Sequence, residues 1–201
     1  MRRVTLRRCG LSMAALLVCL GPAASAQQPA AGSWLDRPLT SWNTPGASIP
    51  SPKAAEEEKT SLIKRCGLQR TAATAPEKAL DAAGWIPFWN FDQQLLRDGI
   101  EIVGGMSGAD GMCRPAAYNL FVFVDGRYAG TLSPATMVSR TDGSSGAVRM
   151  PLPQLTAEFA RFAPTDPLCC PSSRVTVRYR VDRSSAGPVV IPVDVRTTRG
   201  Q

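Results

Sequence analysis

Two adjacent cysteines, Cys169 and Cys170, lie between Pro167 and Pro171 in the stretch "DPLCCPSS". Thiols in proteins serve redox chemistry, bind metals or form structural disulfides. The chain contains no histidine, so Ser-His and Cys-His nucleophile arrangements are excluded and the commonest general base is missing. It also lacks the C-x-x-C spacing of zinc sites and redox motifs. We therefore expect no metal site and no cofactor.

Four cysteines follow the first 26 residues: Cys66, Cys113, Cys169 and Cys170. In an exported protein this even count indicates two disulfides. Consecutive side chains of extended backbone point apart, and flanking prolines favour extended backbone. We therefore expect Cys113 to pair with one of the adjacent cysteines and Cys66 with the other. If the adjacent cysteines were instead free or paired with each other, redox or metal chemistry would become the leading interpretation.

The first 26 residues have the pattern of a signal peptide. Four arginines precede a short apolar run, which ends at the small residues Ala24–Ala26. This pattern predicts cleavage after Ala26. The run is shorter than the roughly 20 residues of a membrane span, and no later stretch reaches that length. We expect a soluble periplasmic or secreted protein with no transmembrane span.

Two other export signals compete with this interpretation. The stretch "LLVC", Leu16 to Cys19, resembles a lipoprotein box that would acylate Cys19, although Val18 stands where Gly, Ala or Ser is usual. The stretch "RRCGL" resembles a twin-arginine signal. The sequence leaves the export route open.

The charge balance argues against nucleic acid as a partner. The chain has 23 basic and 16 acidic residues, but four of the arginines belong to the leader. The remaining net charge of +3 is ordinary for a protein of this length, and no basic run is interleaved with aromatic residues.

Residues 27–60 are rich in Pro, Ala, Gly and Ser and show no apolar periodicity. They predict an extended or disordered lead-in. Trp34 and Trp42 stand out in this segment. They either tuck into grooves of the domain, which we favour, or form a recognition segment for a partner.

Residues 61–201 are expected to form a single domain. We predict helices over Ala75 to Trp85, Phe91 to Asp98 and Leu155 to Phe162, and a strand in "GIEIVGGM". The Asp125-Gly126 pair between two apolar runs predicts a β-hairpin over Ala117–Ser133.

A second hairpin is predicted from strict alternation in "RVTVRYRVD", Arg174 to Asp182. Valines and Tyr179 would face the core, whereas Arg178 and its like-facing neighbours would form a solvated, basic face. The stretch "PVVIPVDVR" returns as the partner strand. Together these elements predict an α+β fold, in which short helices pack on one face of an antiparallel sheet of hairpins stapled by disulfides.

Three aspartates are weak candidates for carboxylate catalysis: Asp110, Asp125 and Asp142. Each precedes a glycine, and Asp-Gly is first of all turn chemistry. No other catalytic motif is present, so whether the protein is an enzyme stays uncertain and we lean against it; we assign no catalytic residue.

Two polar loops carry the candidate binding residues. Arg114 lies in the first, and Ser133, Met137, Arg140 and Asp142 lie in or beside the second. Hydrogen bonds and an Arg–Asp pair that brace the loops would account for them. Alternatively, Arg114, Ser133, Arg140 and Asp142 form a shallow surface that binds an anionic or polymeric ligand of the cell envelope.

The same loops resemble a known family. The stretches "GADGMCRPAAYNLFVFVDGRYAGTLSP", "SRTDG" and "EFARFAPTDPLCCPSSRVTV" are similar to LppP/LprE-type lipoproteins, which are exported bacterial domains without an established molecular function. The resemblance spans about Ala79 to Pro192. It implies a place in the cell envelope and supplies no catalytic residues.

We therefore expect a non-enzymatic envelope protein that binds a ligand or partner. The alternative is an enzyme, or an inhibitor of an enzyme, that acts on cell-wall polymers. Neither the ligand nor the oligomeric state follows from the sequence.

Overall fold

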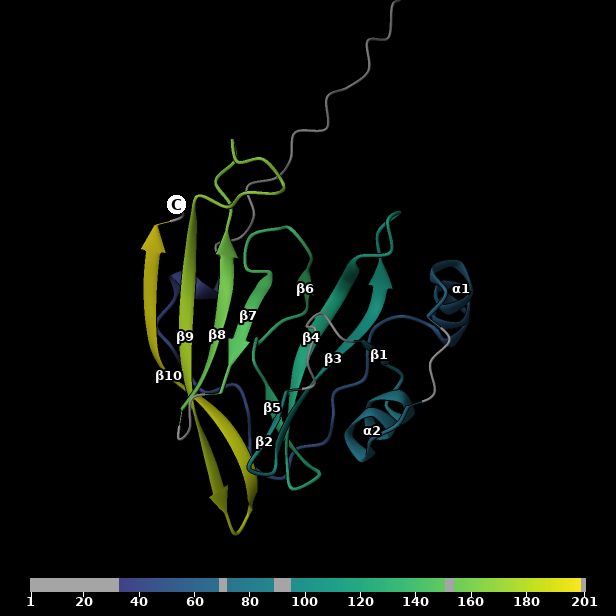
Figure 1. The fold of residues 1–201 in the computed structure, drawn as a ribbon. Helices are drawn as coiled ribbons and strands as arrows, with labels where there is room; N and C mark the ends of the chain where they lie inside the picture. Colours follow the sequence, from purple (N-terminus) through teal and green to yellow (C-terminus); the bar gives the residue numbers. More distant parts are fainter. Residues whose placement is uncertain (1–32, 69–71, 89–94, 151–153, 200–201) are drawn as a thin grey trace, which may run out of the picture. The chain divides into compact units, whose positions relative to one another are not determined.

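A computed structural model describes residues 33–68, 72–88, 95–150 and 154–199. This part of the chain contains a 3-10 helix, two α-helices and ten strands (Figure 1). In chain order they are η1 (Trp34–Asp36), α1 (Glu56–Cys66), α2 (Ala75–Ala82), β1 (Ile86–Phe88), β2 (Leu95–Arg97), β3 (Ile100–Ala109), β4 (Pro115–Val124), β5 (Arg127–Thr131), β6 (Met137–Val138), β7 (Ser145–Arg149), β8 (Gln154–Arg161), β9 (Ser173–Ser184) and β10 (Gly187–Arg199).

The strands form two antiparallel sheets. Sheet A has the order β1-β3-β4-β5, with β2 beside β3 and β6 beside β4. Sheet B has the order β10-β9-β8-β7. Most neighbours in the sheets are consecutive in sequence, so short turns make most of the connections.

Both predicted hairpins are present. Asp125 and Gly126 join β4 to β5 with φ of 49° and 75°, the left-handed backbone of a type I′ turn. In the second hairpin, β9 pairs with β10 along almost its whole length. Its alternation is as predicted, because Val175, Val177 and Tyr179 are buried while Arg174 and Arg180 are exposed.

The main core lies between the two sheets. Ile102, Leu120 and Val122 of sheet A belong to one buried cluster with Phe159 and Val177 of sheet B. These side chains are almost fully excluded from solvent. Burial of such apolar area is the chief stabilising term of the fold.

A second core lies on the opposite face of sheet A, under helix α2. Leu80 and Trp85 pack there against Val103, Phe121 and Phe123. Figure 1 shows α1 and α2 on one side of sheet A and sheet B on the other. Sheet A is therefore covered on both faces, whereas sheet B is covered on one.

Helix α2 begins where the sequence predicts. The Thr74 hydroxyl accepts from the Glu77 amide, and the Glu77 carboxylate accepts from the Thr74 amide at 3.1 Å, which forms a capping box. Pro76 occupies the first turn, where its missing N–H has no cost. The helix ends at Ala82, and Gly84 follows in a left-handed conformation.

The architecture is broadly the predicted α+β fold of antiparallel strands, with helices on one face of a sheet. It differs in having two sheets instead of one. Two predicted helices are wrong. Leu155 to Phe162 lies mainly in strand β8, and the described end of Phe91 to Asp98 forms strand β2 beside β3.

The error at β8 has a specific cause. Leu155 and Phe159 are four residues apart, a spacing that suits a helix face, but they are also an even number apart and so share one face of a strand. Ala157 lies between them on the same face and is fully buried. Pairing with both β7 and β9 decides the conformation, because it supplies hydrogen bonds on both sides of the segment.

Residues 33–60 are the described part of the predicted lead-in. Residues 33–55 have little regular structure, as expected, yet they pack on the domain, and α1 begins inside the range at Glu56. Trp34 contacts Phe159 edge-on, and the Trp42 indole donates to the Thr131 carbonyl at 3.1 Å. Both tryptophans thus fill grooves of the domain, the interpretation that we favoured.

Asn43 of the lead-in joins the two sheets. Its amide nitrogen donates to the Thr131 carbonyl of β5 and to the Val190 carbonyl of β10, and its oxygen accepts from the Thr131 amide. Gly130 has φ of 127°, and a Cβ there would collide with the Asn43 amide group. The bare backbone of Gly130 therefore permits this contact.

The predicted disulfide pairing is wrong. Cys66 pairs with Cys113, with 5.5 Å between their Cα atoms, and Cys169 pairs with Cys170. Helix α1, which the sequence analysis did not identify, is the reason. It ends at Cys66 beside the β3–β4 hairpin, where the Arg65 guanidinium donates to the Ala109 carbonyl at 3.3 Å. Cys113 is thereby used, and the adjacent cysteines are left to each other.

Candidate functional site

The predicted arginines meet at one pocket, which we call the arginine pocket. It has a volume of about 400 Å³. Its walls come from the start of β4, the turn after β6, the start of β7 and the loop between β8 and β9. The lining residues are Arg114, Pro115, Tyr118, Ser139, Arg140, Ser144, Ser145, Gly146, Ala160, Phe162, Leu168, Cys169, Pro171 and Arg174. Three are arginines and none carries a carboxylate.

Arg114 is held in place by Asp110. The Asp110 carboxylate accepts from the backbone amides of Met112 and Arg114 and from the Arg114 Nε, the last at 2.5 Å. The hydrogen bond from the Arg114 amide is the main cause that lowers the pKa of Asp110, so this carboxylate is ionised at neutral pH. Only Nε is engaged, and the terminal nitrogens of Arg114 have no partner among the described residues.

Arg140 and Arg174 add two further positive charges to the pocket. Neither has an ion-pair partner within the part of the chain that the structure describes. Arg140 has a left-handed φ of 62°, in the turn that follows β6. Nη1 of Arg174 lies 3.5 Å from where a Cβ on Gly146 would sit, so the guanidinium lies beside the start of β7. The pocket is electropositive as a result.

The polar wall of the pocket is built around Tyr118. Its buried hydroxyl contacts Ser145 Oγ at 3.0 Å and accepts from the Ser145 amide. Desolvation raises the pKa of Tyr118, so the hydroxyl stays protonated at neutral pH. Ser144 lines the same wall and is 5 % exposed. Hydroxyls beside guanidinium groups are suited to bind an oxyanion.

The adjacent cysteines lie at the rim. Cys169 lines the pocket, and both members of the pair are exposed. Asp166 braces this loop by accepting from the amides of Ala163 at 2.7 Å and Ser172 at 2.8 Å. These two hydrogen bonds lower the pKa of Asp166. The same loop therefore carries both the vicinal disulfide and one wall of the pocket.

The structure brings only some of the predicted site residues together. Arg114 and Arg140 line the pocket, whereas Ser133 is 1 % exposed and its hydroxyl donates to the Ala135 carbonyl at 2.7 Å. Asp142 accepts from Arg161 at 2.8 Å, and Met137 is buried in β6. We therefore leave Ser133 and Asp142 out of the proposed site. Sequence reasoning missed Arg174 as a pocket residue, because the alternation along Arg174 to Asp182 indicated only that this arginine lies on the solvated face of the strand.

The three candidate catalytic aspartates all have local roles. Asp110 holds Arg114, as described above. Asp125 forms the β4–β5 turn and is ion-paired with Arg183. Asp142 is ion-paired with Arg161, which also binds Asp36 of η1 with two hydrogen bonds. Loop bracing therefore accounts for each of them.

Arg161 is the centre of that last network. Desolvation alone would lower the pKa of its guanidinium, but hydrogen bonds to Asp36 and Asp142 raise it above the ordinary value. The network fixes η1 to the end of β8, and Oδ1 of Asp142 accepts from both Arg161 Nε and the Phe162 amide. Asp142 is thus a scaffold residue next to the pocket.

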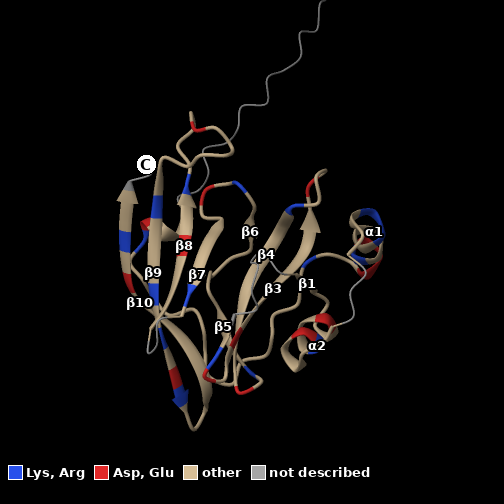
Figure 2. Ribbon diagram, viewed as in Figure 1, with Lys and Arg blue, Asp and Glu red and all other residues tan. Residues whose placement is uncertain are grey.

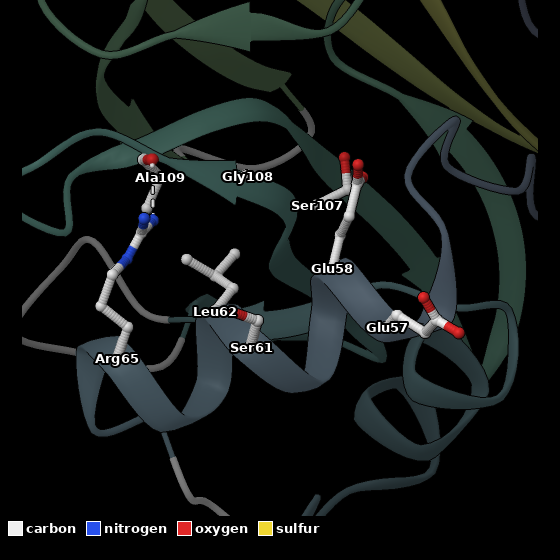
Figure 3. Close-up of a pocket in the computed structure, with 8 residues that line it drawn as sticks. All are labelled: Glu57, Glu58, Ser61, Leu62, Arg65, Ser107, Gly108 and Ala109. Carbon is white, nitrogen blue, oxygen red and sulfur yellow. Dashed lines mark hydrogen bonds between the residues drawn. The ribbon is translucent and has the colours of Figure 1, made fainter.

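A second pocket, of about 410 Å³, lies between helix α1 and the end of β3 (Figure 3). Glu57 and Glu58 line it from the start of the helix, and Glu58 reaches up beside Ser107 of β3. Arg65 closes one end through its bond to Ala109. Its charges are of mixed sign and lie at opposite ends, so it favours no single ligand class as clearly as the arginine pocket does.

Comparison with known proteins supports the family assignment. Residues 101–184 match the LppP/LprE lipoprotein family. The match covers β3 to β9, and with them every residue that lines the arginine pocket. It also confirms the resemblance inferred from the loops. No curated protein and no solved structure matches the chain significantly.

The LppP/LprE match indicates an exported, envelope-associated type of domain. The predicted cleavage after Ala26 and the acylation candidate Cys19 lie outside the described residues. Among the residues that are described, no helix is long and apolar enough to cross a membrane.

Proposed function

We propose that this LppP/LprE-type domain is a non-enzymatic binding module of the cell envelope, and that the arginine pocket binds an anionic group of its ligand. The observation that carries the proposal is the convergence of Arg114, Arg140 and Arg174 on a pocket whose lining holds no carboxylate. Arginine presents a planar fork of N–H donors, which matches the geometry of phosphate and carboxylate. The ligand class is thus an oxyanion such as a phosphate or carboxylate group.

The pocket geometry also favours binding over catalysis. Its described lining offers donors, namely guanidinium, hydroxyl and amide groups, and no ionised carboxylate to act as a general base. A preformed set of donors binds an anion without having to reorganise, which is how fixed recognition sites gain affinity.

The test is a titration with inorganic phosphate, monitored by amide NMR shifts around Ser144 and Gly146. We expect saturable binding that weakens at least fivefold in Arg140→Gln and in Arg174→Gln, both exposed positions at which the fold should survive. Lys78→Gln, on helix α2, is the matched control. Equal affinity in the two pocket variants and the control would contradict the proposal.

We further propose that the protein is exported by cleavage after Ala26 and is soluble in the periplasm or outside the cell. The arginine-rich start, the apolar run and the small residues Ala24–Ala26 support it. Intact mass of the exported protein tests it. A mass that begins at Gln27 is expected, whereas an acylated Cys19 would show a lipid-anchored protein instead.

Pairing of the adjacent cysteines with each other is the outcome for which the sequence analysis favoured redox chemistry, and it supports thiol–disulfide exchange as a second candidate function. We place it after binding because the chain lacks the C-x-x-C motif of redox proteins. Exposed disulfides are more readily reduced than buried ones, and cationic neighbours such as those of the pocket stabilise a thiolate. A substrate thiolate would attack one sulfur of the Cys169–Cys170 bond, and a second substrate thiol would then release it, giving one substrate disulfide and two protein thiols. Mass spectrometry after incubation with glutathione tests this. Loss of the disulfide at Cys169–Cys170 before that at Cys66–Cys113 is expected, and the reverse order would contradict it.

A further inference from the structure

The outer face of sheet B carries five arginines, which we call the basic face: Arg149, Arg174, Arg178, Arg180 and Arg196. All five lie on strands β7, β9 and β10, opposite the face that packs in the core. Figure 2 shows basic segments along these strands. Four of the five arginines are exposed, and Arg178 is half-buried. No lysine contributes to the face.

Strand pairing arranges these arginines in successive rows. A row is a set of residues that lie opposite one another on neighbouring strands. In the first row, Arg180 lies opposite Ile191 of β10 and Gln154 of β8. In the second row, Arg178 lies opposite Thr156 of β8, which lies opposite Arg149 of β7.

Arg196 pairs with Thr176 in the third row, and Arg174 pairs with Ala160 in the fourth. Alternate residues of a strand are about 6.7 Å apart, so an arginine recurs at roughly that interval over about 20 Å.

Few carboxylates oppose this charge. Asp194 contacts Arg178 at 3.2 Å and Arg196 at 3.5 Å, and Glu158 lies in the third row. Asp182 follows Arg180 on the same side of β9, past the end of β8. The four rows hold five positive and two negative side chains. Within the described chain, Arg149, Arg174 and Arg180 have no ion-pair partner.

We infer that the basic face binds a linear polyanion of the phosphodiester type, with one charge about every 6–7 Å along an extended chain. The regular interval of arginines along one strand direction fits such a polymer better than a compact anion. Arginine also binds phosphate with two parallel hydrogen bonds, which a lysine cannot do. This surface adjoins the arginine pocket, and Arg174 is the one residue that belongs to both.

A polymer fits the face better than a membrane surface does. Proteins that lie on membranes insert apolar side chains beside their basic residues. Among the paired positions of the four rows, none is an exposed large apolar residue; the exposed Val195 pairs with the core-facing Val177, and the exposed Val193 lies at the bulge between Pro192 and Asp194. The face therefore offers five arginines and, beside them, one exposed valine at the bulge, which is less apolar surface than a membrane-binding face presents.

The experiment measures binding of a ten-unit poly(glycerol phosphate) chain by fluorescence polarisation at several salt concentrations. We expect log K to fall with log salt with a slope of about −2 to −4, since a few phosphates release their counterions. The double variant Arg149→Gln/Arg180→Gln should bind at least tenfold more weakly, with a slope shallower by about one to two. The control Lys78→Gln/Arg127→Gln removes the same charge from elsewhere and should stay within about twofold.

Several outcomes would overturn the inference. They are an equal loss in both double variants, competition by monomeric glycerol phosphate at equal phosphate concentration, or binding to anionic vesicles but not to the polymer. The pocket is tested separately, because Arg140→Gln should weaken phosphate binding and leave the polymer slope unchanged. Failure of the pocket and failure of the basic face are thus distinguishable.

Discussion

Sheet A and sheet B are built from the same antiparallel hairpins but meet different surroundings. Strand β4 of sheet A is buried on both faces over its last seven residues, between helix α2 and sheet B. Strand β9 of sheet B alternates between buried and accessible side chains. In the sequence, the end of β4 is therefore a continuous apolar run, whereas β9 shows strict alternation of apolar and polar residues. The comparison separates a sheet that holds the fold together from a sheet that presents a surface.

The same contrast separates the two disulfides. Cys66–Cys113 joins α1 to the end of the β3–β4 hairpin across 47 positions of sequence. Cys169–Cys170 joins neighbours in the exposed loop between β8 and β9 of sheet B. The first restricts a long loop of the unfolded chain, and the second restricts almost none.

The largest effect is expected from a cavity in sheet A, which tests whether this sheet is more tightly enclosed than sheet B. Phe121 is fully buried, and its ring lies 5.0 Å from that of Trp85 and packs over the bare Gly105. Phe121→Ala should lower the free energy of unfolding by about 3–5 kcal/mol. Thr176→Ala, on the outer face of β9, should stay within about 0.5 kcal/mol. Urea denaturation of both variants is the measurement, and equal losses would show that sheet B is as tightly enclosed as sheet A.

Removal of the two disulfides should give the next largest difference in the free energy of unfolding. Cys66→Ser/Cys113→Ser should destabilise the fold by about 2–4 kcal/mol, because the unfolded chain regains the freedom of a long loop. Cys169→Ser/Cys170→Ser should change the free energy of unfolding by less than about 1 kcal/mol, since it opens no such loop. Denaturation under non-reducing conditions measures both. A larger loss for the second pair would assign the vicinal disulfide a structural role.

The next largest effect on stability is expected at Asn43, which links the two sheets. Asn43→Ala removes three hydrogen bonds to β5 and β10 and should cost about 1–3 kcal/mol. Ser41→Ala, whose hydroxyl bonds only within the lead-in, is the matched control and should cost much less. Thermal unfolding of both variants checks the difference. Equal melting temperatures would mean that the lead-in does not hold the sheets together.

The smallest effect concerns the loop that carries the vicinal disulfide. The pKa of Asp166 is lowered in the folded protein, so its bracing is fully present above the unfolded pKa of about 3.9 and is lost as pH falls through the folded value. NMR shifts of the Ala163 and Ser172 amides should move together in that acidic range. Asp166→Ala should abolish the transition and leave the global melting temperature nearly unchanged. A transition that persists in the variant would assign it to another group.

Much of the fold could be predicted from local patterns. The Asp125-Gly126 turn, the capped start of α2 and the alternation of β9 each follow from residues close together in sequence, where local sterics and hydrogen bonding decide the conformation. The family resemblance also rested on local stretches, and residues 101–184 confirm it. These features required no knowledge of what packs against them.

What only the tertiary structure decided is how distant segments meet. The pattern around Leu155 and Phe159 suited a helix and a strand equally, and pairing with β7 and β9 selected the strand. The disulfide pairing depended on where α1 ends, and the pocket depended on Arg174 lying across from Gly146. Local sequence determines backbone preference and the periodicity of burial. Which surfaces come into contact is determined by packing and hydrogen bonding between segments far apart in the chain, and these energies are absent from any short stretch of residues.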